Sequence, residues 1–158
     1  MRVTICIITR RRPEGLARLL RSLELISVPD GVEVEVVVVE NDDPTEKQPP
    51  ATTLRLRHAF EPDPGIPAAR NRTLEMALVN PRTDAIAFLD DDETVDPAWL
   101  AALLRTRHRT GAAVVTGPAN PRFPVDAPPW AAVSGVFQPP DYPTGTLRPW
   151  AFTHNALI

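Results

Sequence analysis

Four consecutive carboxylates, Asp90 to Glu93, follow an apolar run at residues 85–89 and are the side chains best suited to chemistry. The apolar run has the length of a buried strand, and a strand end is a rigid mount for side chains. Neighbouring carboxylates repel one another by roughly 1 kcal/mol per pair at about 4 Å, even with the screening of water. A hard cation such as Mg²⁺ or Mn²⁺ would cancel that repulsion. The alternative is a solvated acidic turn that caps the next helix, although Asp96-Pro97 already supplies such a cap.

Polar clusters also follow two other predicted strands, at residues 3–9 and 34–39. The residues at these strand ends are Thr9, Glu40, Asn41 and Asp42. In an open α/β sheet, ligands bind outside the carboxyl ends of the strands. Acidic and basic groups on one rim therefore indicate a site for a polyanion bridged by metal, although each cluster alone is typical of a solvated loop. Arg12 is the best placed of three successive arginines, because it is nearest to the start of the next helix.

A glycine-containing loop at residues 61–65 runs into a helix that carries Arg70 and Asn71 in its first turn. Free backbone N–H groups at such a helix start can bind an anion, and Gly65 is therefore a candidate substrate-binding residue. The loop lacks the Gly-Lys-Ser/Thr ending of a P-loop and is not a dinucleotide fingerprint. An arginine is poorly placed at a helix N-terminus if only the helix dipole matters. We therefore expect Arg70 to contact an acidic partner, either the carboxylate run or a diphosphate.

Strands and helices alternate through the first two thirds of the chain. This alternation predicts an α/β fold with a mostly parallel sheet and helices on both faces. Continuous apolar runs predict buried strands, and leucines spaced three and four residues apart predict the core faces of helices. The predicted strands are residues 3–9, 34–39, 53–57, 85–89 and 112–116, and the predicted helices begin at Pro13, Pro67 and Pro97 and end near Leu23, Asn80 and Arg109.

Length and composition restrict the class of protein. The 158 residues, of which 43% are hydrophobic and 23% charged, suit one domain with a real core. A net charge of −3 offers no basic face for nucleic acid. The single cysteine, Cys6, lies in an apolar run and is expected to be a buried thiol. No apolar stretch is long enough to cross a bilayer, so we expect a cytoplasmic protein, with peripheral membrane attachment left open.

The strand–helix alternation ends near residue 117. We therefore divide the domain into an α/β core at residues 1–117 and a loop-rich, proline-rich segment at 118–158 that belongs to the same domain. The segment carries too many large apolar side chains for a solvated tail, and we expect an ordered flap packed over the sheet. These side chains are Phe123, Trp130, Val133, Val136, Phe137 and Trp150.

Four sequence pieces, in order, resemble the family-two glycosyltransferases of the GT-A fold. The pieces are Thr9 with Arg12-Pro13, residues 36–41, residues 65–71, and residues 88–92 followed by Pro97-Ala98-Trp99-Leu100. The resemblance covers residues 1 to about 117 and thins afterwards. It implies a nucleotide-diphospho-sugar transferase fold, Rossmann-like, with a C-terminal flap.

The resemblance also implies roles for particular residues. Thr9 and the loop from Glu40 to Asp42 match the family's pocket for the nucleotide base and ribose, and Arg70 matches an arginine near the base or diphosphate. Asp90 to Asp92 match the Asp-x-Asp motif, which contacts the ribose and holds Mn²⁺ or Mg²⁺ on the diphosphate. Asp92 is the first choice as metal ligand, with Asp90 as the second. The implied substrates are a UDP-, GDP- or dTDP-sugar and an unidentified acceptor.

Two departures from the family pattern concern the nucleotide base. The second strand ends in Glu40 where aspartate is usual, and Arg10 stands where an aromatic residue is frequent. A third departure concerns catalysis, because an inverting enzyme needs a carboxylate base. Residues 153–158 resemble the strand that precedes that base in the family, so we expect the base beyond Ile158. Asp141 is another available carboxylate, and His154 is either a substrate contact or an ordinary strand residue.

The sequence thus predicts the sugar-nucleotide-binding part of a metal-dependent, inverting glycosyltransferase. A sugar-nucleotide-binding module without turnover is the first alternative, since the expected base-bearing segment is missing. A sugar nucleotidyltransferase ranks third, because Arg10 to Arg12 supply charge after the first strand but no glycine-rich phosphate loop follows it.

Overall fold

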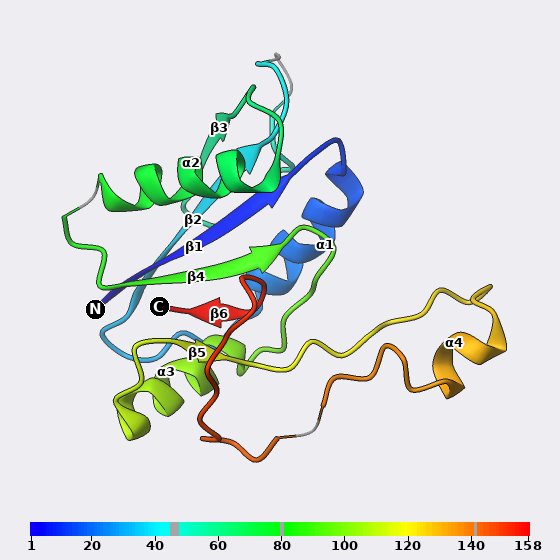
Figure 1. Cartoon of the computed structure of the whole chain (residues 1–158). Coiled ribbons are helices and arrows are strands. Elements are labelled where there is room, and N and C mark those ends of the chain that lie inside the picture. The colour runs from blue at the N-terminus through cyan, green and yellow to red at the C-terminus, as the bar shows by residue number, and fades with distance from the viewer. Residues whose placement is uncertain (45–47, 80, 141) are drawn as a thin grey trace.

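The computed structural model describes residues 1–44, 48–79, 81–140 and 142–158. Helices and strands alternate along the core, as the sequence predicts, and the order of elements is shown in Figure 1. The elements are β1 (Arg2–Thr9), α1 (Pro13–Leu23), β2 (Glu33–Glu40), β3 (Leu56–Phe60), α2 (Ile66–Leu78), β4 (Ala85–Asp90), α3 (Trp99–Thr110), β5 (Val115–Thr116), α4 (Pro129–Val133) and β6 (Ala156–Leu157).

The strands form one sheet in the order β3-β2-β1-β4-β6-β5. β3, β2, β1 and β4 are parallel, whereas β6 pairs antiparallel with both β4 and β5. The predicted α/β class with a mostly parallel sheet is therefore confirmed. Because four neighbouring strands run in one direction, their carboxyl ends lie along a single rim of the sheet.

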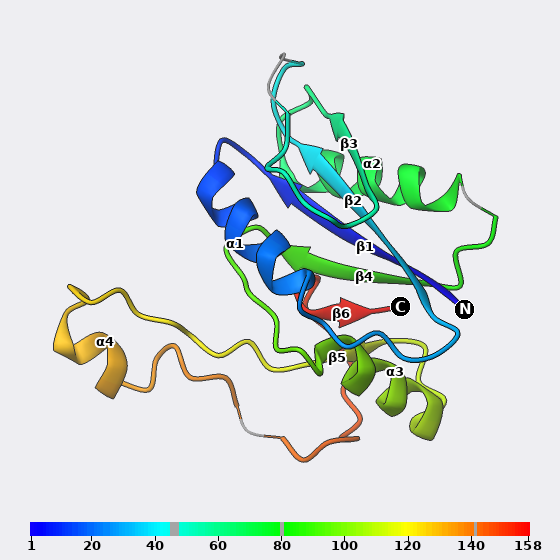
Figure 2. The ribbon, with the colours of Figure 1, turned by 180° about the vertical axis from the view of Figure 1, so that it is seen from behind.

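Helices cover both faces of this sheet. The leucines of α1, predicted to share one face, are all buried and pack with α3 residues against β1, β2 and β4. The opposite face packs against α2 through a smaller cluster that includes Cys6, Ala69 and Ala77. Figure 1 shows α2 in front of the sheet. Figure 2 shows the molecule from behind, with α1 and α3 on the opposite face of the sheet. None of the helices in the described ranges is long and apolar enough to cross a membrane.

The third strand and the second helix differ in detail from the sequence prediction. The third strand begins at Leu56 rather than at residue 53, because the chain at residues 53–55 first turns to bond with the end of α1. Leu78, predicted to face the core, is 63% exposed at the last turn of α2. The predicted helix stop at Asn80 lies outside the described residues.

The C-terminal end of the chain returns to the sheet. Residues 112–116 and 153–158 were expected to form longer strands, but only Val115–Thr116 and Ala156–Leu157 pair as strands. Asn155 joins the two, since its side chain accepts a bond from Trp99 Nε1 at 2.7 Å and donates to the Pro118 carbonyl at 2.8 Å. Asn155 has a φ of 47°, a left-handed conformation that asparagine tolerates better than most residues. This buried carboxamide links α3 to the two short strands.

The first part of the proline-rich segment, residues 118–140, does not pack over the sheet as expected. Both views show α4 and its flanking chain extending away from the sheet (Figure 1, Figure 2). Its aromatic side chains contact one another instead, with ring centroids 5.9 Å apart for Phe123 and Phe137 and 6.3 Å for Trp130 and Phe137. Prolines deny this segment the backbone hydrogen bonds of a strand or long helix. These three aromatic rings therefore pack locally, whereas Val133 and Val136 stay exposed.

We expect the Cys6 thiol to resist labelling in the native protein. Its side chain is buried on the α2 face, and burial raises its pKa from 9.0 to about 12. Only the thiolate reacts rapidly, so native protein at pH 8 should release almost no chromophore from a disulfide reagent such as DTNB. Guanidinium-unfolded protein, the control, should release one equivalent from the single cysteine. Rapid labelling of native protein would contradict the packing of α2 on β1.

The same pKa shift makes the stability of the protein depend on pH in a defined direction. A raised folded pKa means that the unfolded state releases its proton first, so this contribution to stability is lost as pH rises from about 9 towards 12.

Candidate functional site at the carboxyl rim of the sheet

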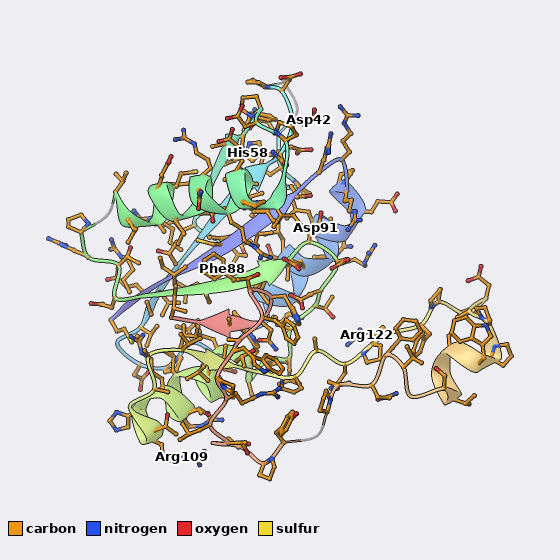
Figure 3. The ribbon with its side chains drawn as sticks, in the orientation of Figure 1. Asp42, His58, Phe88, Asp91, Arg109 and Arg122 are labelled. Atoms are coloured by element: carbon orange, nitrogen blue, oxygen red, sulfur yellow. The ribbon has the colours of Figure 1, made fainter. Side chains whose placement is uncertain are left out.

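The ends of β1, β2 and β4 bring the predicted polar clusters together. Thr9 lies directly opposite Glu40 in the β1–β2 register, and the residue before Thr9 lies opposite Asp90 in β4. Figure 3 shows Asp42 and Asp91 on this rim, and Arg109 at the opposite end of the molecule. The rim therefore joins residues from three strands that are widely separated in the sequence.

The three aspartates after β4 have different surroundings. Asp91 is buried, accepts a hydrogen bond from Thr9 Oγ1 at 2.7 Å, and lies 3.3 Å from Arg12 Nη1. Asp92 leaves 64% of its side chain exposed and contacts Arg12 Nη1 at 3.4 Å. Asp90 is partly exposed. Asp91 thus ties the acidic turn to β1 and α1, whereas Asp90 and Asp92 present carboxylates to solvent.

Arg70 connects α2 to the acidic turn. Its Nη2 lies 2.8 Å from Asp90 Oδ1, and the side chain of Arg70 is mostly buried. Its Nη1 donates a hydrogen bond to Thr153 Oγ1 on the C-terminal segment. Of the two acidic partners expected for Arg70, the structure shows the carboxylate run. The pair leaves an arginine and an aspartate side by side at the rim.

The β1–α1 and β2 loops are locked to each other at the rim. Arg11 has a φ of 55°, and its backbone N–H donates to Glu40 Oε1 at 3.0 Å. The Arg11 guanidinium also forms an ion pair with Asp42 and lowers the pKa of that carboxyl. This left-handed arginine is a strained conformation that the two acidic partners hold. The two loops predicted to form the base and ribose pocket are therefore joined to each other by Arg11.

Asn41 and Gly65 organise the loop that leads into α2. The buried Asn41 carboxamide donates to the carbonyls of Glu61 and Asp63 at 2.9 and 2.7 Å, and it accepts the Gly65 N–H at 2.9 Å. Gly65 has a φ of 124°, a conformation that side chains rarely permit. Both residues were predicted to bind substrate. In the structure their polar groups hold the loop in shape beside the rim.

Sequence reasoning treated Glu93 only as one of four carboxylates in the acidic run, and it left the role of His154 open. His154 lies before β6, not within it, and its Nδ1 is 3.1 Å from Glu93 Oε1. Glu93 Oε2 accepts the Asp90 backbone N–H at 2.9 Å. Burial raises the pKa of the Glu93 carboxyl, against the opposing effects of that backbone bond and of His154. No local pattern could reveal the pair, because its members are 61 residues apart. Asp141, the other candidate base, lies outside the described residues.

Gly15 is a second residue that sequence reasoning missed. It lies in the first turn of α1, and a Cβ built there would be 2.7 Å from the backbone oxygen of Asp91. The acidic turn can therefore approach α1 this closely only because residue 15 has no side chain. A glycine inside a helix, where it costs about 0.5–1 kcal/mol, is the signal that could have pointed to this contact.

The rim offers donors for a divalent metal without forming a closed cage. In the described residues, no three His, Cys, Asp or Glu side chains are grouped so as to hold a metal ion. Mg²⁺ commonly binds through one or two carboxylates and completes its shell with substrate phosphates and water. Asp90 and Asp92 fit that pattern, since both are partly exposed oxygen donors beside the cationic Arg12 and Arg70.

Comparison with known proteins identifies the family. A sequence profile described as Glycosyl transferase family 2 matches residues 4–151. The succinoglycan biosynthesis protein ExoM of Rhizobium meliloti (strain 1021) is 38% identical over 166 residues, an alignment that covers 100% of this chain and 52% of ExoM. The chain thus spans about half the length of this relative.

Solved structures share the fold. A crystal structure of S. aureus TarS 1-349 aligns with a TM-score of 0.57 and 20% identity over 77% of this chain and 39% of that one. A structure of S. aureus TarS aligns with a TM-score of 0.59 and 21% identity over 80% of this chain and 23% of that one. TarS 1-349 has also been crystallised with UDP-GlcNAc and with UDP. Together with the profile match over most of the chain, these findings show that the chain belongs to glycosyl transferase family 2.

Proposed function

We propose that this chain is the nucleotide-sugar-binding part of an inverting, metal-dependent glycosyltransferase. The donor is a nucleoside-diphosphate sugar, and an acceptor hydroxyl displaces the nucleoside diphosphate at the anomeric carbon. The observation that carries the proposal is the meeting of Thr9, Glu40 and the Asp90–Asp92 turn on one rim, flanked by Arg12 and Arg70. Family membership does not favour the binding-module or nucleotidyltransferase alternatives. The cytoplasmic setting expected from the sequence is part of this proposal.

Different residues of the rim bind different parts of the donor. The loops carrying Glu40 and Asp42 face the base and ribose, with Thr9 and Asp91 fixing the turn beneath. Arg12 and Arg70 lie beside carboxylates and can donate to diphosphate oxygens. Asp90 and Asp92 would hold Mn²⁺ or Mg²⁺, which supplies Lewis-acid stabilisation of the departing diphosphate. UDP is the first nucleotide to test, because the TarS complexes contain UDP and UDP-GlcNAc.

We expect nucleoside diphosphate to bind much better in the presence of metal. Without a cation, the carboxylates of the acidic turn repel the diphosphate; a cation bound by those carboxylates would attract it. Calorimetric titration of UDP and GDP, each with Mn²⁺ and after EDTA treatment, measures the effect. The control is uridine, which lacks the diphosphate and should show no dependence on metal. Equal affinity for UDP with and without metal would contradict the metal part of the proposal, and no binding of any nucleotide would contradict the donor site itself.

A further inference from the structure

Asp90 is held both through its side chain and through its backbone. Its Oδ1 lies 2.8 Å from Arg70 Nη2, and its backbone N–H donates to Glu93 Oε2 at 2.9 Å. The backbone N–H of Glu93 donates in return to the Asp90 carbonyl at 3.2 Å. Asp90 Oδ2 makes no hydrogen bond or ion pair with any residue in the described ranges. One carboxylate oxygen of Asp90 is therefore held, and the other can bind a ligand.

The Glu93 carboxylate takes the place of a missing strand neighbour. In the antiparallel register of β4 and β6, which lie side by side in Figure 1, His154 would be opposite Asp90 if β6 continued. The chain instead leaves this register at Asn155, whose φ is 47°. Every second residue of a strand turns its N–H to the same neighbour, so the N–H of Asp90 faces β6, as that of Ile86 does. Because no strand acceptor is present there, Glu93 supplies one.

His154 holds the second oxygen of the Glu93 carboxylate. Its Nδ1 lies 3.1 Å from Glu93 Oε1, and the ring of Phe152 stacks on the imidazole with 5.4 Å between ring centres. The side chains of Glu93 and His154 are only 18% and 32% exposed, so solvent competes less for this contact than for a surface ion pair. Both oxygens of Glu93 are thus engaged, one by the Asp90 N–H and the other by the imidazole.

We propose that Glu93 is a positioning residue for the metal-binding carboxylate of Asp90, and that His154 orients Glu93. This inference rests on the proposed function, because it concerns the residues that support the same site. Groups that hold a metal ligand in place contribute to metal affinity without touching the metal. Glu93 acts through the backbone of Asp90, so the hydrogen-bond acceptor is what the site requires at this position. Direct binding of the metal by Glu93 fits less well, since each of its oxygens already has a partner.

The test compares variants of the full chain by calorimetric titration of UDP and uridine in the presence of Mn²⁺. Glu93→Ala should weaken Mn²⁺-dependent UDP binding by about 10–100-fold. Glu93→Gln keeps an acceptor for the Asp90 N–H, and its affinity should lie closer to that of the wild type than to that of Glu93→Ala. His154→Ala should lose about tenfold. His154→Asn, whose amide can replace Nδ1, should recover most of that loss. Uridine affinity should be unchanged throughout, because uridine has no diphosphate to bring to the metal.

Glu24→Ala is the matched control. The Glu24 carboxylate also accepts a backbone N–H, that of Thr53 at 2.8 Å, together with the hydroxyl of Thr52 at 2.7 Å. These bonds join the end of α1 to the chain before β3, at the opposite edge of the sheet from the rim. The substitution therefore removes the same charge and the same kind of bond, and it should leave the affinity for UDP unchanged.

Three results would overturn the proposal while the proposed function stands. The first is a Glu93→Ala variant with wild-type affinity for UDP and Mn²⁺. The second is an equal loss of UDP and uridine affinity, which would show a general collapse of the rim. The third is a Glu93→Gln variant as weak as Glu93→Ala, because charge and not the backbone bond would then matter.

The variants of His154 and the wild-type protein complete the test. If Glu93→Ala does not fold, the comparison of His154→Ala with His154→Asn decides, and unchanged UDP affinity in His154→Ala contradicts the role given to His154. If the wild-type protein binds no UDP, or binds it equally well after EDTA treatment, the proposed function itself fails.

Discussion

Replacing Asp92 with alanine is expected to weaken Mn²⁺-dependent UDP binding by about 100-fold or more, because a bound metal contributes several kcal/mol of charge stabilisation. The side chain of Asp92 is 64% exposed and meets only Arg12, at 3.4 Å, within the described residues. An exposed ion pair of this kind is worth about 0–1 kcal/mol, and removing Asp92 also relieves repulsion within the acidic turn. The free energy of unfolding should therefore change by about 0.5 kcal/mol or less. Calorimetry with and without EDTA, together with urea unfolding, measures the two effects separately.

The control for this experiment is Asp126→Ala. Asp126 is another exposed aspartate, but it lies on the proline-rich segment away from the rim. The Asp126→Ala substitution removes the same charge from the protein as Asp92→Ala and should leave UDP affinity unchanged. If Asp92→Ala keeps the full metal dependence, Asp92 is not a ligand. If Asp92→Ala instead lowers stability by more than about 1 kcal/mol without changing metal dependence, the turn acts as a helix cap.

The contrast between adjacent aspartates explains how one short acidic run can be held in place and still expose carboxylates. Asp91 turns inward to Thr9 and Arg12, so its charge is satisfied within the fold. Asp90 and Asp92 turn outward on either side of it, where guanidinium groups partly neutralise them. A run in which all three carboxylates were solvated would be mobile. The buried middle residue therefore positions the two outer ones.

The fold of the core could be predicted from the sequence because its signals are local. Pro13 and the leucine spacing of α1 predict both its start and its buried face, and the apolar runs of β1, β2 and β4 predict strands buried on both sides. Such patterns arise within one element, so no knowledge of distant contacts is needed. The meeting of polar strand ends at one rim then follows from parallel topology.

The remaining features could not be predicted because they depend on contacts between distant residues. The inward orientation of Asp91 is set by Thr9, 82 positions away, and the pairing of His154 with Glu93 spans 61 positions. The proline-rich segment misled the sequence reasoning for a related reason. Its large apolar side chains indicated burial against the sheet, but composition does not specify the partner, and the rings pack on one another instead.

Gly15→Ala is expected to destabilise the protein by about 1–3 kcal/mol, although alanine is the better helix former. The new Cβ would lie 2.7 Å from the Asp91 carbonyl oxygen, closer than such atoms approach, so α1 or the acidic turn must move. Because the turn carries Asp90 and Asp92, its displacement should also weaken Mn²⁺-dependent UDP binding, by about tenfold, as shifts in groups that position metal ligands typically do. Urea unfolding and calorimetry measure the two losses.

Ala17→Gly is the opposite substitution in the same helix and serves as the control. At an ordinary helical position, replacing alanine with glycine costs about 0.5–1 kcal/mol through backbone entropy. It should leave UDP affinity unchanged, because Ala17 is not among the buried residues of α1. Helix propensity alone predicts that Gly15→Ala stabilises the protein by a similar amount. The two substitutions therefore give opposite signs under propensity and the same sign under the contact with Asp91. A stabilised Gly15→Ala variant with normal UDP affinity would show that the acidic turn does not depend on its close packing against α1.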